Sequence, residues 1–143
     1  MKRELTGSMV FDTSALLEML FSTPYRVKAR EALKSHSLSL RVCDITMAEA
    51  EYVLCKRLGE DEAHDRITNL LKSGYVDVYP DSELIEDAAE YKCKRSLSLL
   101  NCFSLALAKR KGTPVVFARR EKELEDEMSK KPFDVDILFL EEF

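Results

Sequence analysis

The sequence has few of the residues that interrupt regular structure: its 143 residues include only 4 glycines, 4 prolines and no tryptophan. This argues against collagen-like, low-complexity and disordered chains, which are rich in glycine, proline or net charge. Apolar residues make up 45% and charged residues 34%, as in a single compact domain with one core. No apolar run approaches the ~20 residues that span a bilayer, and the first residues lack the apolar segment of a signal peptide. We therefore expect no membrane partner and a cytoplasmic location.

An excess of basic charge is also absent. The chain has 22 Lys and Arg against 26 Asp and Glu, which gives a formal net charge of -4. Proteins that coat nucleic acid without sequence preference are usually strongly basic. Any contact with nucleic acid must therefore be local.

The cysteines form no C-x-x-C pair, and the two histidines do not complete a zinc-ligand spacing. We expect Cys43, Cys55, Cys93 and Cys102 to be reduced and to act as small packing residues. The sequence also lacks a dinucleotide-binding G-x-G-x-x-G, a P-loop and a G-x-S-x-G nucleophile elbow. Dinucleotide-binding, P-loop and serine-hydrolase functions therefore have no motif to support them.

The apolar pattern predicts strands that alternate with helices. Strands are expected at residues 8–11, 38–42, 75–79, 114–117 and 135–140, with helices starting near Asp12, Thr23, Thr46, Asp61, Ser82, Ser98 and Arg119. Thr46 with Glu49 three residues later is a capping-box pattern. Strands separated by helices indicate parallel pairing with right-handed crossovers. We therefore predict an α/β fold: a three-layer α/β/α sandwich around a mostly parallel, five-stranded sheet.

Three polar residues are expected beyond the carboxyl ends of these strands, where such sheets bind ligands. Asp12 follows the first strand, Glu49 lies in the helix after the second, and Asn101 lies in the first turn of the helix that starts at Ser98. Oxygen ligands from distant parts of a chain suit hard cations such as Mg²⁺ or Mn²⁺. Structural roles remain open, because Asp12 and Glu49 could cap helices and Asn101 could satisfy a helix-end amide.

Four segments in this order resemble the PIN-domain family. They are residues 10–17 (VFDTSALL), 45–49 (ITMAE), 97–106 (LSLLNCFSLA) and 113–118 (TPVVFA). The resemblance runs from about Met9 to Phe143 and implies a single PIN-like domain over residues 9–143. Residues 1–8 are then an N-terminal extension of uncertain origin. The resemblance implies a metal-dependent ribonuclease fold, shared by the VapC-type toxins of prokaryotic toxin–antitoxin pairs.

The resemblance also assigns roles to individual acids. Asp12 and Glu49 match the family's first and second acids, and Ser14 matches the hydroxyl that supports the first. Asn101 stands where the third acid is usual, and its carbonyl can bind a hard cation but adds no negative charge. Glu121 is the candidate substitute for the fourth acid. The implied catalytic residues are Asp12, Glu49 and Asn101, and these three with Glu121 are the implied metal ligands.

Basic residues and partners follow from the same resemblance. Arg119 stands near the family's fourth acid, and Arg119 and Arg120 are the basic residues best placed to hold RNA phosphates. The family implies a homodimer and a small antitoxin protein whose segment lies across the site. The apolar stretch 15–21 is then either core or a face toward a second subunit.

These patterns favour a metal-dependent endoribonuclease that hydrolyses RNA phosphodiester bonds, the toxin of a toxin–antitoxin pair. The alternative is a catalytically impaired PIN-like domain that acts as an RNA-binding or protein-interaction module, which Asn101 and Arg119 would support. A phosphoryl-transfer hydrolase or receiver-like domain with Asp12 as nucleophile fits less well. Ser14 stands where an Asp-x-Asp hydrolase needs its second acid.

Overall fold

The computed structural model describes residues 3–21 and 24–143. In this part of the chain the strands are β1 (Gly7–Phe11), β2 (Leu38–Cys43), β3 (Val76–Tyr79), β4 (Val115–Phe117) and β5 (Ile137–Phe139). They form one sheet in the order β3-β2-β1-β4-β5, and every neighbouring pair is parallel. The predicted five-stranded sheet is confirmed, and it is parallel throughout.

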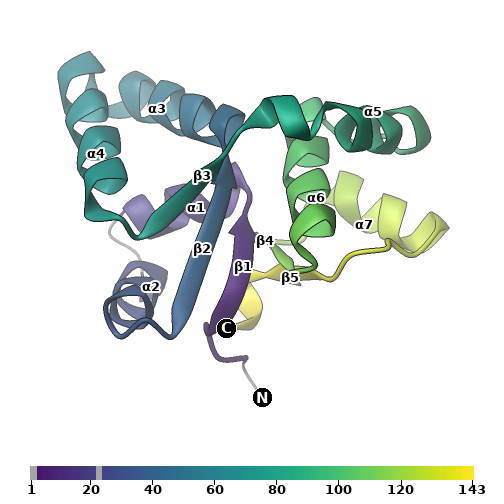
Figure 1. Cartoon of the computed structure of the whole chain (residues 1–143), viewed down its shortest axis with the longest axis horizontal. Helices are drawn as coiled ribbons and strands as arrows, with labels where there is room; N and C mark the ends of the chain where they lie inside the picture. The colour runs from purple at the N-terminus through teal and green to yellow at the C-terminus, as the bar shows by residue number, and fades with distance from the viewer. Residues whose placement is uncertain (1–2, 22–23) are drawn as a thin grey trace.

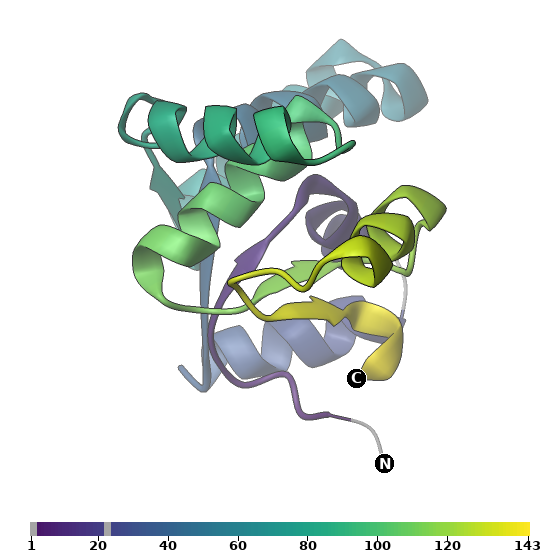
Figure 2. The same cartoon turned by 90° about the vertical axis from the view of Figure 1, so that its right-hand side faces the viewer.

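Helices cover both faces of this sheet. They are α1 (Thr13–Leu20), α2 (Pro24–Lys34), α3 (Asp44–Leu58), α4 (Glu60–Ser73), α5 (Ile85–Lys94), α6 (Leu99–Lys111) and α7 (Lys122–Lys130), with single 3₁₀ turns η1 (Asp81–Glu83) and η2 (Leu140–Glu142). Helices α1 to α4 lie on one side of the sheet and α5 to α7 on the other (Figure 1). In Figure 2 the second group lies in front of the strands. The three-layer α/β/α prediction is therefore confirmed.

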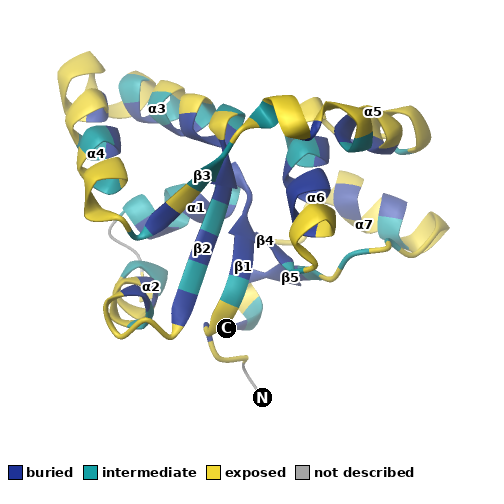
Figure 3. Ribbon diagram, in the orientation of Figure 1, coloured by how far each residue is buried: buried dark blue, intermediate teal, exposed yellow. Residues whose placement is uncertain are grey.

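Alternating side chains of the strands build a core on each face. Phe11 and Val116 belong to the apolar cluster under α1 to α4, whereas their neighbours Val10 and Val115 belong to the cluster under α5 to α7. The central strand β1 and its neighbour β4 are largely buried (Figure 3). Burial on both faces is expected of parallel strands between helical layers, and it holds the carboxyl end of β1 rigidly.

Three helix starts differ from the sequence predictions. Helix α3 begins at Asp44, directly after β2, so Thr46 lies inside its first turn and does not cap it. Helix α5 begins only after the η1 turn, so Ser82 is not its cap. Helix α7 begins at Lys122, and Arg119 lies in the connection before it. Each prediction relied on local residue type, whereas the end of the preceding strand or turn sets where these helices begin.

Other boundaries agree with the sequence. The Ser98 hydroxyl caps α6 by accepting a hydrogen bond from the Asn101 N–H at 3.2 Å. Helices α4 and α6 end at Gly74 and Gly112, whose φ angles of 72° and 64° lie in the left-handed region that favours glycine. The predicted cap of α2, Thr23, lies outside the described residues. Among the residues that are described, no helix is both long and apolar enough to cross a lipid bilayer.

The N-terminal segment joins the fold before Met9. Leu5 is buried in the core, and Gly7 begins β1. The Arg3 N–H donates a hydrogen bond to the Glu142 carbonyl at 2.9 Å. This contact ties the segment that begins at residue 3 to the C-terminal turn η2.

The cysteines are free thiols. Cys43 and Cys102 are buried and Cys55 is partly buried, as expected of packing residues. Cys93 is exposed on α5, so the packing expectation is wrong there. Its sequence neighbours Lys92 and Lys94 are charged and exposed, and Cys93 lies with them on the outward side of an amphipathic helix.

Candidate metal centre

The sheet order places Asp12 at a topological switch point. From the central strand β1 the order runs through β2 to β3 on one side and through β4 to β5 on the other. Open parallel sheets bind ligands beyond the carboxyl ends of the strands at such a point. Asp12 directly follows β1, and its N–H donates to the Val116 carbonyl of β4 at 3.0 Å.

Hydrogen bonds from two helices, α1 and α6, hold the Asp12 carboxylate. Its Oδ2 accepts from the Ser14 N–H at 3.1 Å and from the Ser14 hydroxyl at 3.0 Å. Its Oδ1 accepts from the Ser104 hydroxyl of α6 at 3.4 Å. The Ser14 Oγ itself accepts from the Ala118 N–H, just beyond β4, at 3.0 Å. Asp12 therefore caps α1 and lies at the meeting point of α1, α6 and β4, so the capping and site roles are compatible.

The electrostatic environment of Asp12 suits a cation. The residue is only 5% exposed. Burial, and to a smaller extent the nearby charge of Glu49, raises the pKa of Asp12 to about 6, although the hydrogen bonds from Ser14 oppose the rise. No Lys, Arg or His side chain within residues 3–21 and 24–143 forms an ion pair with Asp12 or Glu49. A buried carboxylate without a cationic partner is costly, and a bound cation would offset that cost.

Glu49 and Asn101 belong to two other helices. Glu49 is half-buried in α3, and its charge contributes, less than burial does, to the raised pKa of Asp12. Since α3 begins at Asp44, Glu49 is not the capping-box partner of Thr46, and that structural alternative is wrong. Asn101 is half-buried in the first turn of α6, one turn before Ser104, which binds Asp12. Residues three apart share a helix face, so Asn101 lies on the side of α6 that faces Asp12.

Glu121 is not brought into this group. It is exposed at the start of α7, where its side chain makes no capping hydrogen bond. Over the described part of the chain, no cluster of three or more His, Cys, Asp or Glu side chains has the arrangement to hold a metal ion. Asp12 and Glu49 are therefore the two carboxylates of the candidate site, and Asn101 is the candidate neutral oxygen ligand.

The two candidate phosphate-binding arginines differ in their surroundings. Arg119 is 67% exposed and pairs with Glu18 of α1, with Nη2 3.3 Å from Oε1. Arg120 pairs with Glu142 at 2.6 Å and lies over the Phe139 ring at 4.5 Å. Arg120 therefore belongs to the contacts that fix the C-terminal segment, whereas Arg119 projects from the end of β4 beside α1.

Ser104, which contacts Asp12 directly, was not among the predicted site residues. The one sequence signal for it is a hydroxyl within the apolar run of α6, three residues after Asn101. A second acidic pair, also not predicted, lies at this edge of the sheet: the Asp81 N–H donates to Asp44 Oδ2 at 3.3 Å, and burial followed by the charge of Asp44 raises the pKa of Asp81. Cys43 lies nearby, and burial, with added effects of the Asp81 and Asp12 charges, raises its pKa to about 12.

The raised pKa of Asp12 predicts how stability depends on pH. Between about pH 4 and 6 the folded protein binds a proton at Asp12 that the unfolded chain releases, so the free energy of unfolding falls as pH rises through this window. The contribution of this one group is at most about 1.4 kcal/mol per pH unit. Urea unfolding of the metal-free protein from pH 4 to 7, compared with the Asp12→Asn variant, measures it. Identical pH profiles for the two proteins would contradict the assigned environment of Asp12.

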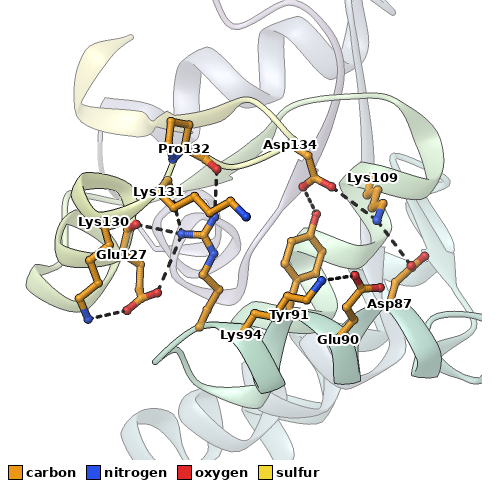
Figure 4. A pocket seen from close by; sticks show the side chains of 11 residues that line it. Asp87, Glu90, Tyr91, Lys94, Lys109, Glu127, Lys130, Lys131, Pro132 and Asp134 are labelled. Atoms are coloured by element: carbon orange, nitrogen blue, oxygen red, sulfur yellow. Dashed lines mark hydrogen bonds and ion pairs between the residues drawn. The ribbon is translucent and has the colours of Figure 1, made fainter.

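A separate cavity of about 340 Å³ lies between α5, α7 and the segment before β5. Most of its charged side chains are paired with one another (Figure 4): Lys109 is 3.8 Å from Asp87 and 3.5 Å from Asp134, and Tyr91 donates a hydrogen bond to Asp134. None of the residues predicted to form the site lines it. The candidate chemistry therefore lies at the end of β1, and this cavity is a compensated polar network.

The fold and the site together define a class: a parallel α/β/α protein with a buried carboxylate at its switch point. The family model of the PIN domain matches residues 9–126, and the chain belongs to the PIN domain family. No curated protein sequence matches the chain.

Solved structures share the fold at low sequence identity. VapC20 from Mycobacterium tuberculosis, described as a sarcin-ricin loop cleaving toxin, is 18% identical with a TM-score of 0.63, over 82% of this chain and 93% of that chain. VapBC2 from Rickettsia felis, bound to a promoter DNA fragment, is 12% identical with a TM-score of 0.64, over 92% and 97%. FitAcB from Neisseria gonorrhoeae is 19% identical with a TM-score of 0.58, over 91% and 96%.

Proposed function

We propose that the chain is an endoribonuclease that hydrolyses RNA phosphodiester bonds with the help of bound Mg²⁺ or Mn²⁺. The observation that carries the proposal is the Asp12 carboxylate, which is buried at the switch point, has its pKa raised in part by the charge of Glu49, and has no ion-pair partner among the described side chains. Membership of the PIN domain family supports it. The similarity in fold to a sarcin-ricin loop cleaving toxin supports RNA as the substrate.

The residues present fit a hard divalent cation, because the donors are two carboxylates and an amide oxygen. Asp12 and Glu49 would hold the ion, and the Asn101 carbonyl would bind it or orient the attacking water. When bound, the ion lowers the pKa of a water and neutralises charge on the phosphate. Ser14 and Ser104 keep the Asp12 carboxylate in one orientation through their hydrogen bonds. Glu121 would act only as an outer acid, since it stands apart from this group.

The proposal includes a toxin role with protein partners. Structures of similar fold are toxin–antitoxin complexes, among them one from Klebsiella pneumoniae at 16% identity with a TM-score of 0.58. On this basis we infer a small antitoxin partner, a homodimer and action on RNA in the cytoplasm. Within the stretch 15–21, Ala15, Leu16 and Met19 are buried in the core. The partly buried apolar side chains that remain for contact with a partner are Leu17, Leu20 and Phe21.

A second function is favoured by two particular residues. Asn101 stands where the family usually has its third acid and Arg119 stands near its fourth, which is the pattern expected of an impaired PIN-like domain that binds RNA or protein. A cleavage assay on single-stranded RNA in Mn²⁺ and in EDTA separates the two functions. Turnover by the natural chain in Mn²⁺ supports the nuclease. RNA binding without turnover, with cleavage restored by Asn101→Asp, supports the impaired module, and no cleavage by either protein overturns the nuclease proposal.

Asn101→Asp is expected to strengthen Mn²⁺ binding at least tenfold. A negative charge added at ~4 Å from a divalent ion contributes about 2 kcal/mol even with the screening of bulk water. Isothermal titration calorimetry measures the affinity, and Asn69→Asp on the exposed surface of α4 is the matched control. Equal Mn²⁺ affinities for the two variants would show that Asn101 does not face the ion.

A further inference from the structure

Arg119 places a positive charge next to the candidate metal centre, which contains only two acids, Asp12 and Glu49. Beyond β4, the Ala118 N–H donates to the Ser14 Oγ at 3.0 Å, and the Ser14 hydroxyl donates to Asp12 Oδ2 at 3.0 Å. The backbone of residue 118 is therefore two hydrogen bonds away from the Asp12 carboxylate. Arg119 is the next residue, and its side chain is 67% exposed. The backbone of Arg119 thus lies at the edge of the candidate metal centre, and its guanidinium is accessible to solvent.

An ion pair fixes the side on which this guanidinium lies. Arg119 Nη2 is 3.3 Å from Glu18 Oε1. Glu18 lies six residues after Asp12 on α1, or about 9 Å along the helix axis. Across the described residues, Glu18 is the single carboxylate in an ion pair with Arg119. One contact uses few of the five N–H donors of a guanidinium, so the others can bind a phosphate.

The charge balance of the site leaves a role for the Arg119 guanidinium in binding phosphate. The two carboxylates of Asp12 and Glu49 balance one divalent ion, and the described residues provide no cluster of three ligating side chains. A phosphodiester brings a further negative charge, which grows in the transition state of hydrolysis. Arginine binds phosphate through two parallel hydrogen bonds, and its charge does not depend on metal concentration.

We propose that Arg119 is a built-in cation of the site, which binds the phosphate of single-stranded RNA beside Asp12 and Glu49 so that one divalent ion suffices per chain. This inference rests on the proposed ribonuclease function and specifies how its substrate is held. Arg119 takes the substrate phosphate from the α1 side, exchanging or sharing its contact with Glu18. RNA binding through Arg119 therefore requires no metal, whereas cleavage requires the ion held by Asp12 and Glu49.

The test is RNA binding by the metal-free protein. Fluorescence anisotropy of a short, labelled single-stranded RNA in EDTA compares the natural chain with Arg119→Ala, Arg119→Lys and Arg110→Ala. Arg110 is the matched control, because it is 48% exposed, forms one ion pair with Glu83 at 4.0 Å and lies at the opposite end of α6 from Asn101. Thermal unfolding confirms that each variant folds.

Arg119→Ala is expected to weaken RNA binding about tenfold, as for loss of a charge-assisted hydrogen bond. It should also reduce the slope of log affinity against log salt by about 0.7. The RNA affinity of Arg119→Lys should lie between those of the natural chain and Arg119→Ala. The RNA affinity of Arg110→Ala should stay within about twofold of that of the natural chain. Calorimetry should give one Mn²⁺ per chain for both the natural protein and Arg119→Ala.

Two outcomes overturn this inference alone: RNA binding that is equally strong in Arg119→Ala and Arg110→Ala, or two Mn²⁺ ions per natural chain. Failure of the ribonuclease proposal has a different signature, because it appears as absent RNA cleavage in Mn²⁺. Absence of any RNA binding by the natural chain overturns both.

Discussion

Asp12→Asn should abolish metal-dependent RNA cleavage and at the same time stabilise the fold. Loss of a charged ligand should reduce cleavage by more than the ~100-fold that changes to outer hydrogen-bond partners can cause. The free energy of unfolding at pH 7 should rise, because the variant removes a charge that is 5% exposed and whose pKa is raised to about 6. The expected gain is about 1–3 kcal/mol. An Asn side chain can still cap α1.

These opposite effects distinguish a functional carboxylate from a structural one, since a merely structural Asp12 would lose stability when replaced. Cleavage rates in Mn²⁺ and urea unfolding at pH 7 measure the two effects. Asp77→Asn, on the exposed side of β3, is the control and should change neither. Full cleavage activity in Asp12→Asn would refute the role assigned to Asp12.

Arg95→Ala should produce the largest loss of stability among the polar residues. The Arg95 side chain is 9% exposed, and its guanidinium donates to the carbonyls of Glu127 at 3.0 Å, Lys131 at 2.7 Å and Pro132 at 3.0 Å. It also lies over the Phe133 ring at 3.8 Å. These contacts attach the end of α7 to α5 beside the cavity in Figure 4.

Removing Arg95 leaves the buried Glu127 carboxylate, 5% exposed and 3.9 Å from the guanidinium, with Lys130 as its one ion-pair partner among the described residues. Breaking a buried pair in this way costs about 3–5 kcal/mol. Guanidinium chloride unfolding measures the loss. Lys94→Ala is the control, because its exposed pair with Glu90 should contribute at most about 0.5 kcal/mol. A loss for Arg95→Ala no larger than that of the control would contradict this account of the α5–α7 contact.

The fold was predictable because it depends on repeated local patterns. In β2, Leu38, Leu40 and Val42 are buried while Ser39 and Arg41 are half-buried, as their alternation predicts. The order of strands and helices along the chain was enough to predict a parallel sheet with helices on both faces. The position of Asp12 at the carboxyl end of the first strand followed from the same pattern.

The side-chain partners of Asp12 and Arg119 were not predictable, because they are contacts between residues far apart in the sequence. Ser104 binds Asp12 across 92 residues of sequence, and Arg119 pairs with Glu18 across 101. No local pattern specifies such pairs. The start of α3 was misplaced for a related reason: Thr46 resembles a cap locally, but β2 runs directly into the helix at Asp44.

The central claim is that Asp12 and Glu49 jointly hold one divalent ion. A crystal structure of the protein soaked in Mn²⁺, with data collected for anomalous scattering, tests it most directly. The account predicts one anomalous peak per chain, within coordination distance of a carboxylate oxygen of each residue. A well-occupied peak elsewhere, or carboxylates of Asp12 and Glu49 that point apart with no peak between them, would contradict it.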